Sequence, residues 1–405
     1  MVFFERRLHM KQLSHKISSM KTSSVRILTE YADEAEKAGK KIYRLNIGQP
    51  DLLTPYEYYR NIRNFNQPTV AYMPSNGLPE LIESVERFYI ESGIGINKNN
   101  IAITTGGSEA VLFSILTLTN PGDEFIVFEP YYSNYNTIFT ITGAKPVAVT
   151  TYADNGFHFG KNELIAALTD KTKAILVTNP GNPTGTVLTK NEVRMIADVA
   201  KEYDLYIIAD EVYREIIFDG RDVTSFGFLN DIYDRLIIID SVSKRFNACG
   251  ARIGAVITKN QEIYASISKL CQSRLSVSTI EQHAAVGLFS AAHRQISQVR
   301  DEFQLRRDIV FQALRIIPGV ICRKPEGAFY VICKLPVNDA NEFLIWLLKD
   351  FDINGETVMA APADGFYLTE GLGKDEIRIA YILETTKLQR AMDILAVGIR
   401  EYNKK

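Results

Sequence analysis

Short apolar runs alternate with segments of helical length and period over residues 101–258. The runs are IAIT at 101–104, EFIVFEP at 124–130, KPVAVTT at 145–151, KAILVTNP at 173–180, LYIIADE at 205–211, RLIIID at 235–240 and RIGAVIT at 252–258. Intervening segments such as Ser108–Leu118 and Lys190–Tyr203 have the period of helices. Strands that alternate with helices indicate a mostly parallel sheet covered on both faces. We therefore predict a three-layer α/β/α architecture.

The two ends of the chain have a different pattern. Thr22–Lys40 has apolar positions on one helical face, and the strand-like KIYRLNIG at 41–48 follows it. After about Thr279 the pattern changes to long helical segments, then the strand-like stretches 327–335 and 376–382, and a closing helix. We predict a large α/β domain over 50–290 and a smaller α+β domain formed by 1–49 and 291–405. A chain without a Pro/Gly-rich linker favours domains packed with a cleft between them.

Composition narrows the class of partner. The 405 residues contain 46 Lys and Arg against 48 Asp and Glu, for a net charge of -2. A net charge this close to zero produces no overall electrostatic field that would attract nucleic acid or an anionic membrane. Small molecules are therefore the expected partners. No apolar run has the length of a membrane span, and the basic start of the chain lacks the apolar region of a signal peptide. We expect a cytoplasmic protein in which the scattered Cys249, Cys271, Cys322 and Cys333 are reduced core thiols.

Polar residues gather where the predicted strands end. Gly106, Gly107 and Ser108 open a helix, where free N–H groups can seat a phosphate. The string NPGNPTG at 179–185 holds Asn182 in a rigid loop, and Asp210 ends an apolar strand. Taken singly, these features also fit a tight turn, a plain loop and a helix cap.

The fourth strand end, SVSKRFNACGAR at 241–252, carries Ser241, Ser243, Lys244 and Arg252. A lone lysine is nearly always a solvated surface charge, but here it shares a sheet edge with a phosphate-type loop, an amide and a buried carboxylate. Pyridoxal phosphate needs this combination: an amine for an imine, an anion seat, and a carboxylate beside a ring nitrogen.

At this point the chain resembles the fold-type I, class I/II aminotransferases. The matching strings are LNIGQPDLLTP, YMPSNGLPEL, TTGGSEAV, PYYSNY, NPGNPTG, ADEVY, SVSKRFNACGARIG and RIAYILE, which run in the family's order from residue 45 to residue 384. The lysine loop departs from the commonest pattern, because Arg245 and Phe246 stand where many relatives have smaller residues. This departure leaves the specificity for the substrate side chain open.

The resemblance implies a role for each matching residue. Lys244 would hold the cofactor as an internal aldimine and afterwards move the substrate α-proton, and Asp210 would pair with the ring nitrogen. Asn182 and Tyr213 would bind the phenolic oxygen of the ring, and Tyr132 would stack on the ring. The phosphate ligands would be Gly107, Ser108, Ser241, Ser243, Arg252 and, from a neighbouring subunit, Tyr72. Arg378 would clamp the substrate carboxylate, and Gly48 would approach it through its backbone. A site shared in this way requires at least a homodimer.

The reaction we expect is a ping-pong amino transfer between an L-amino acid and a 2-oxo acid. Aspartate or another dicarboxylic amino acid is the first donor to consider, with Arg274, contributed by the partner subunit, as a candidate cation for the distal carboxylate. Aromatic amino acids come next. A carbon-sulfur β-lyase of the same fold and a non-catalytic aminotransferase-like sensor are the alternatives. A nicotinamide dehydrogenase is excluded, because GxGxxG follows none of the early strands.

Overall fold

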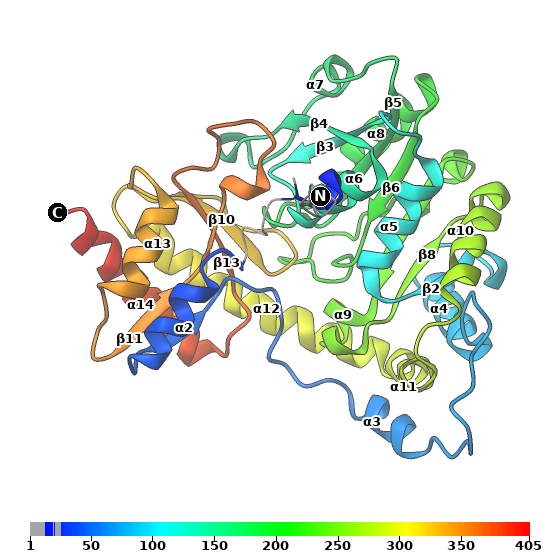
Figure 1. Ribbon diagram of the computed structural model, residues 1–405, viewed down its shortest axis with the longest axis horizontal. Coiled ribbons are helices and arrows are strands. Elements are labelled where there is room, and N and C mark those ends of the chain that lie inside the picture. Colours follow the sequence, from blue (N-terminus) through cyan, green and yellow to red (C-terminus); the bar gives the residue numbers. More distant parts are fainter. Residues whose placement is uncertain (1–12, 19, 21–25) are drawn as a thin grey trace, which may run out of the picture.

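A computed structural model describes residues 13–405 except 19 and 21–25. Its centre is a seven-stranded sheet in the order β2-β8-β7-β6-β5-β3-β4 (Figure 1). The strands are β2 (Ile101–Thr104), β3 (Glu124–Glu129), β4 (Lys145–Thr150), β5 (Thr172–Thr178), β6 (Tyr206–Asp210), β7 (Leu236–Ser241) and β8 (Gly254–Ile257). All neighbours are parallel except β8, which is antiparallel to both β2 and β7.

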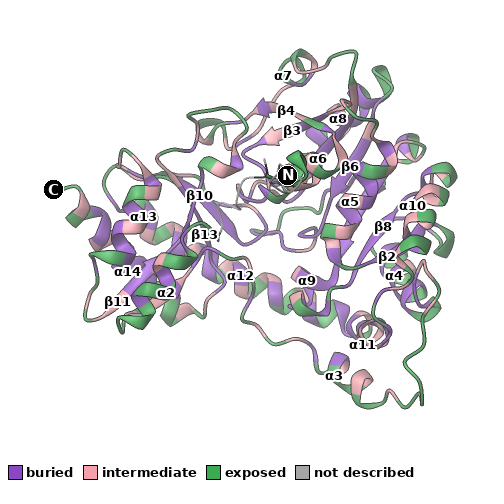
Figure 2. Ribbon diagram, viewed as in Figure 1, coloured by how far each residue is buried: buried purple, intermediate pink, exposed green. Residues whose placement is uncertain are grey.

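Helices cover both faces of this sheet, which confirms the predicted three-layer architecture. Successive residues of a strand point to opposite faces, so Ile237 and Ile239 belong to one apolar cluster and Ile238 to another. The first cluster includes α5 (Gly106–Leu118), α6 (Asn134–Thr142) and α10 (Gln261–Arg274). The second includes α4 (Pro79–Glu91), α7 (Lys161–Ala166), α8 (Lys190–Glu202) and α11 (Thr279–Ser290), and α3 (Tyr56–Arg63) packs on α11. Figure 2 shows the strands buried between these layers.

Residues 29–44 and 321–405 lie together on one side of the large sheet (Figure 1). A two-stranded parallel sheet pairs β1 (Lys41–Arg44) with β11 (Glu356–Met359). Beside it, β12 (Ala361–Pro362), β13 (Glu376–Ala380), β10 (Tyr330–Lys334) and β9 (Ile321–Cys322) form an antiparallel sheet. The helices here are α2 (Thr29–Lys37), α13 (Ala340–Lys349), α14 (Thr385–Tyr402) and the long α12 (Ala292–Arg315), and the short α1 (His15–Ser18) contacts α6. The domain limits at residues 50 and 290 stay a prediction.

Two sequence expectations are refined by the structure. The first long helix covers Thr29–Lys37 within the predicted 22–40, and it ends before Gly39, whose φ of +90° no other residue adopts easily. Residues 22–25 of that prediction lie outside the described part. The four cysteines are free thiols, but only Cys271 and Cys333 are buried, while Cys249 and Cys322 are partly exposed.

Candidate active site

Lys244 lies on α9 (Val242–Arg245), a single helical turn directly after β7. Its Nζ donates to the Gly48 carbonyl at 3.0 Å and lies 3.9 Å from Cys249 Sγ. The amine also lies 5.7 Å from the centre of the Phe329 ring. The loop after β1 is thus joined to the lysine of the large sheet, and Lys244 sits between the two parts of the fold.

Asp210, the last residue of β6, is buried. Its Oδ2 accepts a hydrogen bond of 2.6 Å from the Tyr135 hydroxyl, which lies 2.9 Å from Thr178 Oγ1. Burial raises the pKa of Asp210 to about 6, against the lowering effects of the Tyr135 bond and of the Lys244 charge. A carboxylate kept from water in this way is strongly stabilised by a cationic donor.

Arg378 on β13 is only 2% exposed. Its Nη1 donates to Asn182 Oδ1 at 3.0 Å and its Nη2 to the Asn46 carbonyl at 2.5 Å, while Nε has no hydrogen-bond partner. Within residues 13–405 as described, no carboxylate lies within ion-pair distance of this guanidinium. Burial lowers the pKa of Arg378 accordingly, because the charged form lacks an anion.

The candidate phosphate ligands come together at the start of α5. Gly106 has φ +75°, and a Cβ there would come within 2.5 Å of Arg252 Nη2, so the Arg252 side chain lies against this helix start. Ser241 Oγ accepts from the Ser243 N–H at 3.1 Å and lies 2.8 Å from Ser243 Oγ. A Cβ added to Gly107 would lie 3.8 Å from Ser241 Cβ, so Gly107 belongs to the same group of candidate phosphate ligands. Ser108 follows it in the chain and is exposed. Free N–H groups, hydroxyls and a guanidinium are the donors that a phosphate needs.

Aromatic residues line the space between these groups. Burial raises the pKa of Tyr132. The titratable groups that interact with it electrostatically are Tyr330, Lys244, Arg378 and Asp210. The Tyr213 hydroxyl lies 2.9 Å from the Tyr330 hydroxyl, and a methyl group on Gly48 would overlap that same Tyr330 hydroxyl. The absence of a side chain at Gly48 therefore lets Tyr330 pack against the loop that also holds Lys244.

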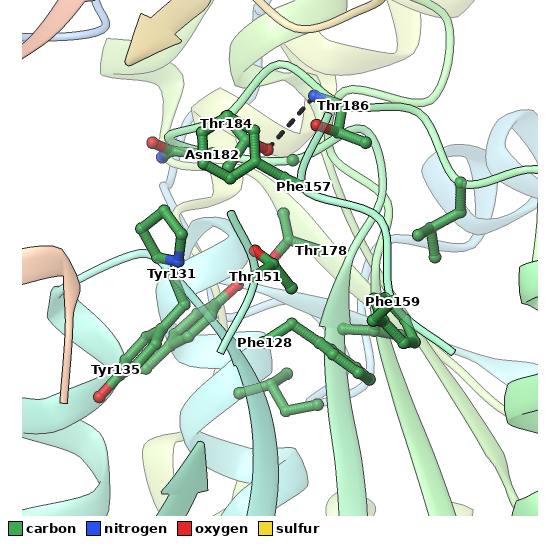
Figure 3. A pocket seen from close by; sticks show the side chains of 15 residues that line it. Phe128, Tyr131, Tyr135, Thr151, Phe157, Phe159, Thr178, Asn182, Thr184 and Thr186 are labelled. Atoms are coloured by element: carbon green, nitrogen blue, oxygen red, sulfur yellow. Dashed lines mark hydrogen bonds between the residues drawn. The ribbon is translucent and has the colours of Figure 1, made fainter. Parts of the chain in front are cut away.

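A cavity of about 50 Å³ adjoins the site on the side of β5 (Figure 3). Tyr135, Thr178 and Asn182 line it together with the rings of Phe128 and Phe159. A volume of this size with hydroxyl and amide groups in its wall holds one or a few water molecules.

Two predicted residues lie apart from this cluster. Tyr72, between α3 and α4, is 76% exposed, and no described contact joins it to the other candidates in the same chain. Arg274, the last residue of α10, donates to the Ser75 carbonyl at 3.1 Å and the Ile103 carbonyl at 3.3 Å, and lies 3.5 Å from Glu109. Its guanidinium therefore already has hydrogen-bond and ion-pair partners within its own chain.

Sequence reasoning missed Tyr135 and Tyr330. Both stand in tyrosine-containing strings, PYYSNY and GAFYV, where the pattern does not say which ring reaches the site. The separation of Tyr135 from Asp210 is 75 residues, so only the fold brings them together. The sequence also did not predict that the Asn179-Pro180 and Asn182-Pro183 peptide bonds are cis.

Comparison with known proteins decides the family. The profile of the family described as "Aminotransferase class I and II" matches residues 40–395. The chain belongs to the class I and II aminotransferases. Members of this family use pyridoxal phosphate and exchange amino groups between amino acids and 2-oxo acids.

Named relatives agree with this assignment. The aminotransferase is 29% identical over 402 residues to aspartate aminotransferase from Bacillus subtilis, covering 97% of this chain and all of that protein. It is 30% identical over 398 residues to aromatic-amino-acid aminotransferase 2 from Thermococcus litoralis, covering 96% and 98% of the two chains. The solved structure of Thermus thermophilus aspartate aminotransferase with maleate superposes with a TM-score of 0.88 at 27% identity, covering 96% of this chain and 100% of that one.

The predicted fold and enzyme class are thereby confirmed, and neither the β-lyase nor the sensor is favoured. Among the described helices of the aminotransferase, none is long and apolar enough to cross a membrane. The roles assigned to individual site residues stay predictions.

Proposed function

We propose that this aminotransferase works with pyridoxal phosphate attached to Lys244 and accepts the α-carboxylate of its amino-acid donor at Arg378. The buried guanidinium of Arg378 carries the proposal. A buried cation without an anionic partner is costly, and the described chain supplies hydrogen-bond acceptors but no carboxylate. A substrate carboxylate completes this site by accepting from the remaining donors of the planar fork.

The residues around Lys244 fit the cofactor. The first turn of α5, with Ser241, Ser243 and Arg252, supplies donors for its phosphate, and Asp210 supplies a carboxylate for its ring nitrogen. Tyr213 and Asn182 would meet the phenolic oxygen, and Tyr132 the ring face. When bound, pyridoxal phosphate supplies a ring that accepts the electrons left at the substrate α-carbon.

The chain's own residues then bind the donor and move its proton. Arg378 fixes the α-carboxylate, which orients the α-carbon toward Lys244. Lys244 Nζ would take the α-proton as a general base and return it one position along. One water molecule would then supply the carbonyl oxygen of the released 2-oxo acid, while the amino group stays with the cofactor. Asp210 keeps a protonated ring nitrogen charged in a buried setting. A second 2-oxo acid takes up the amino group by the same steps in reverse.

Aspartate or another dicarboxylic amino acid is the proposed donor. The Bacillus subtilis relative is named for aspartate, and the related Thermus thermophilus structure holds maleate, a dicarboxylate. An aromatic donor is the second candidate, because the Thermococcus litoralis relative is named for it and tyrosine rings line the site. The contacts of Arg274 within its own chain weaken the case for that residue as the distal cation.

A donor screen tests the proposal. The purified protein is loaded with pyridoxal phosphate and mixed with aspartate, glutamate, phenylalanine or tyrosine, and formation of the 2-oxo acid is followed with and without 2-oxoglutarate. We expect one half-turnover without the acceptor and continuous turnover with it, and neither from a Lys244→Ala control. The absence of 2-oxo acid formation with every amino acid would overturn the proposal. Continuous ammonia release without an acceptor would contradict amino transfer.

We further propose that the enzyme is a homodimer in which Tyr72 reaches the neighbouring subunit's phosphate site. The large exposed ring of Tyr72 supports this, since a side chain with no contacts in its own site is available to another chain. Sedimentation of the loaded protein tests it, and a monomer at working concentration would contradict it. A cytoplasmic location stays a prediction.

A further inference from the structure

A buried cluster of charges lies behind the candidate active site. It consists of Arg214, Arg245, Glu211, Glu215 and Asp240, which we call the Arg245 cluster. The side chains of Arg214 and Arg245 are each 1% exposed, and that of Glu211 is fully buried. Arg214 lies 3.3 Å from Glu211 and 2.9 Å from Glu215. None of these residues has a role in the proposed chemistry.

Arg245 makes the densest contacts of the cluster. Its Nη1 and Nη2 donate to the two oxygens of Asp240 at 3.0 and 2.7 Å, and its Nε donates to Glu215 at 2.9 Å. Its guanidinium also lies 4.7 Å from the centre of the Phe88 ring on α4. Asp240 receives a further bond of 2.8 Å from the Tyr89 hydroxyl. Three of its five N–H donors and one ring contact thus hold this guanidinium in place.

The ion pair between Arg245 and Asp240 closes a loop around the candidate cofactor residues. Ser241, Ser243 and Lys244 all lie between the two paired positions. The bond to Glu215 joins this loop to the segment after β6, which follows Asp210 directly and includes Tyr213. The Arg245 cluster therefore braces the segment that carries Lys244 and the segment that follows Asp210.

The direction of Lys244 depends on this brace. The helix that carries Lys244 is a single turn, which has little stability of its own. Neighbouring helical residues point about 100° apart, so the burial of Arg245 against Phe88 fixes which way its neighbour faces. Lys244 then points in another direction, to the Gly48 carbonyl.

We infer that Arg245 is a positioning residue that sets the direction of Lys244 and the spacing of Ser241 and Ser243, an inference that rests on the proposed function of these residues. Burial of so many charges does not by itself make a fold more stable than a well-packed apolar core would be. Three donors used at once on two carboxylates require the planar guanidinium fork, and lysine has no such fork. The cluster thus specifies geometry in a way that the apolar core does not.

The test compares two buried arginines. Arg245→Lys keeps the charge and removes the fork. The matched control is Arg307→Lys: Arg307 is buried on α12 and donates with two nitrogens to Asp219 at 3.0 and 2.8 Å, and its described bonds include neither Lys244 nor a member of the Arg245 cluster. Each purified apoprotein is mixed with pyridoxal phosphate well below its unfolding temperature. Borohydride then traps covalently attached cofactor, and mass spectrometry of the Lys244 peptide gives the rate of capture.

We expect Arg245→Lys to capture the cofactor about 10- to 100-fold more slowly than the wild type, as a misplaced reacting group does. Arg307→Lys should capture it at the wild-type rate even if its unfolding temperature falls as far. Equal capture rates in Arg245→Lys and the wild type would overturn the inference and leave the proposed function intact. Failure of the wild type to attach cofactor at Lys244 would instead overturn both.

A second variant covers the case in which Arg245→Lys does not fold. Glu215→Gln keeps the shape of the side chain but only one of the two acceptor oxygens that Arg214 and Arg245 use, and it removes one charge from the brace. A slower capture in this variant, by a smaller factor, supports the inference. Wild-type capture by a folded Glu215→Gln protein, together with a misfolded Arg245→Lys protein, would assign the cluster to fold stability alone and overturn it.

Discussion

Replacement of Arg378 separates substrate binding from cofactor binding. The wild-type guanidinium uses one hydrogen on Nη1 for Asn182 and one on Nη2 for the Asn46 carbonyl. Because arginine has five N–H donors, three remain, including the unpartnered Nε, and two of them suffice for a bidentate grip on a carboxylate. Arg378→Lys keeps a positive charge but offers no second parallel donor.

The magnitude follows from the bonds that are lost. A hydrogen bond to a charged group contributes about 1.5–3 kcal/mol, so loss of one of the two bonds in Arg378→Lys lowers kcat/KM for the amino acid about 10- to 100-fold. Arg378→Leu loses both and should lower it about 10²- to 10⁴-fold. Attachment of the cofactor at Lys244 should change far less than kcat/KM in either variant, because Arg378 makes no described bond to Lys244 and reaches the proposed cofactor ligands only through Asn182.

Single-turnover rates with varied amino acid give kcat/KM for the first half-reaction. The matched control is a change in the substrate: phenylalaninamide in place of phenylalanine lacks the carboxylate, so it should react equally poorly with wild type and Arg378→Lys. If Arg378→Lys processes phenylalanine or aspartate within about threefold of the wild-type rate, Arg378 does not bind the carboxylate, since a single lost bond costs more than that.

Further predictions concern the carboxylate, the alternative cation and the subunit contact. Burial raises the pKa of Asp210 from 3.8 to about 6, so the native apoprotein binds a proton that the unfolded chain releases, and stability should fall by about 3 kcal/mol as pH rises between these values. Asp210→Asn should remove that part of the pH dependence, measured by urea unfolding of wild type and variant at both ends of the range; an unchanged slope would contradict it. Arg274→Lys should lower kcat/KM for aspartate and phenylalanine by the same factor, because its contacts are with Glu109 and backbone of its own chain; a selective loss with aspartate would restore it as the distal cation. Tyr72→Phe should weaken retention of pyridoxal phosphate during dialysis in the dimer, and unchanged retention would argue against the contact across subunits.

The pattern of the sequence predicts much of the large sheet, because its strands are short and apolar between helices of clear period. It does not reveal that β8 runs antiparallel, since strand direction depends on the connection and on the pairing with β2 and β7. The strand ends identified Asp210 and Lys244 together, because a carboxylate, an amine and a phosphate-type loop at one sheet edge are unusual in combination, although each alone also fits a helix cap, a surface charge or a tight turn. A position at a strand end gives no such information about a tyrosine, because tyrosine occurs both in apolar cores and in binding sites.

Arg245 shows most clearly which kind of residue the sequence alone does not identify. In the sequence it is only a departure from the commonest pattern beside the lysine, and its partners Asp240 and Glu215 lie on different segments. A buried ion pair is specified by the coincidence of two chain positions in space, and no local period encodes it. Residues that act directly on a ligand are therefore easier to find from sequence than those that hold them in place.

The pairing of β1 with β11 has a consequence for synthesis of the chain. Lys41 of β1 meets Glu356 of β11 only after 315 further residues have been added. At ribosomal rates this takes roughly 15 to 60 s, during which the first strand has no partner while the strands of the central sheet already emerge. An unpaired strand edge invites association with other chains, and charged residues counteract it. Lys41 and Arg44, at the two ends of β1, place such charges on the segment that waits longest for its partner.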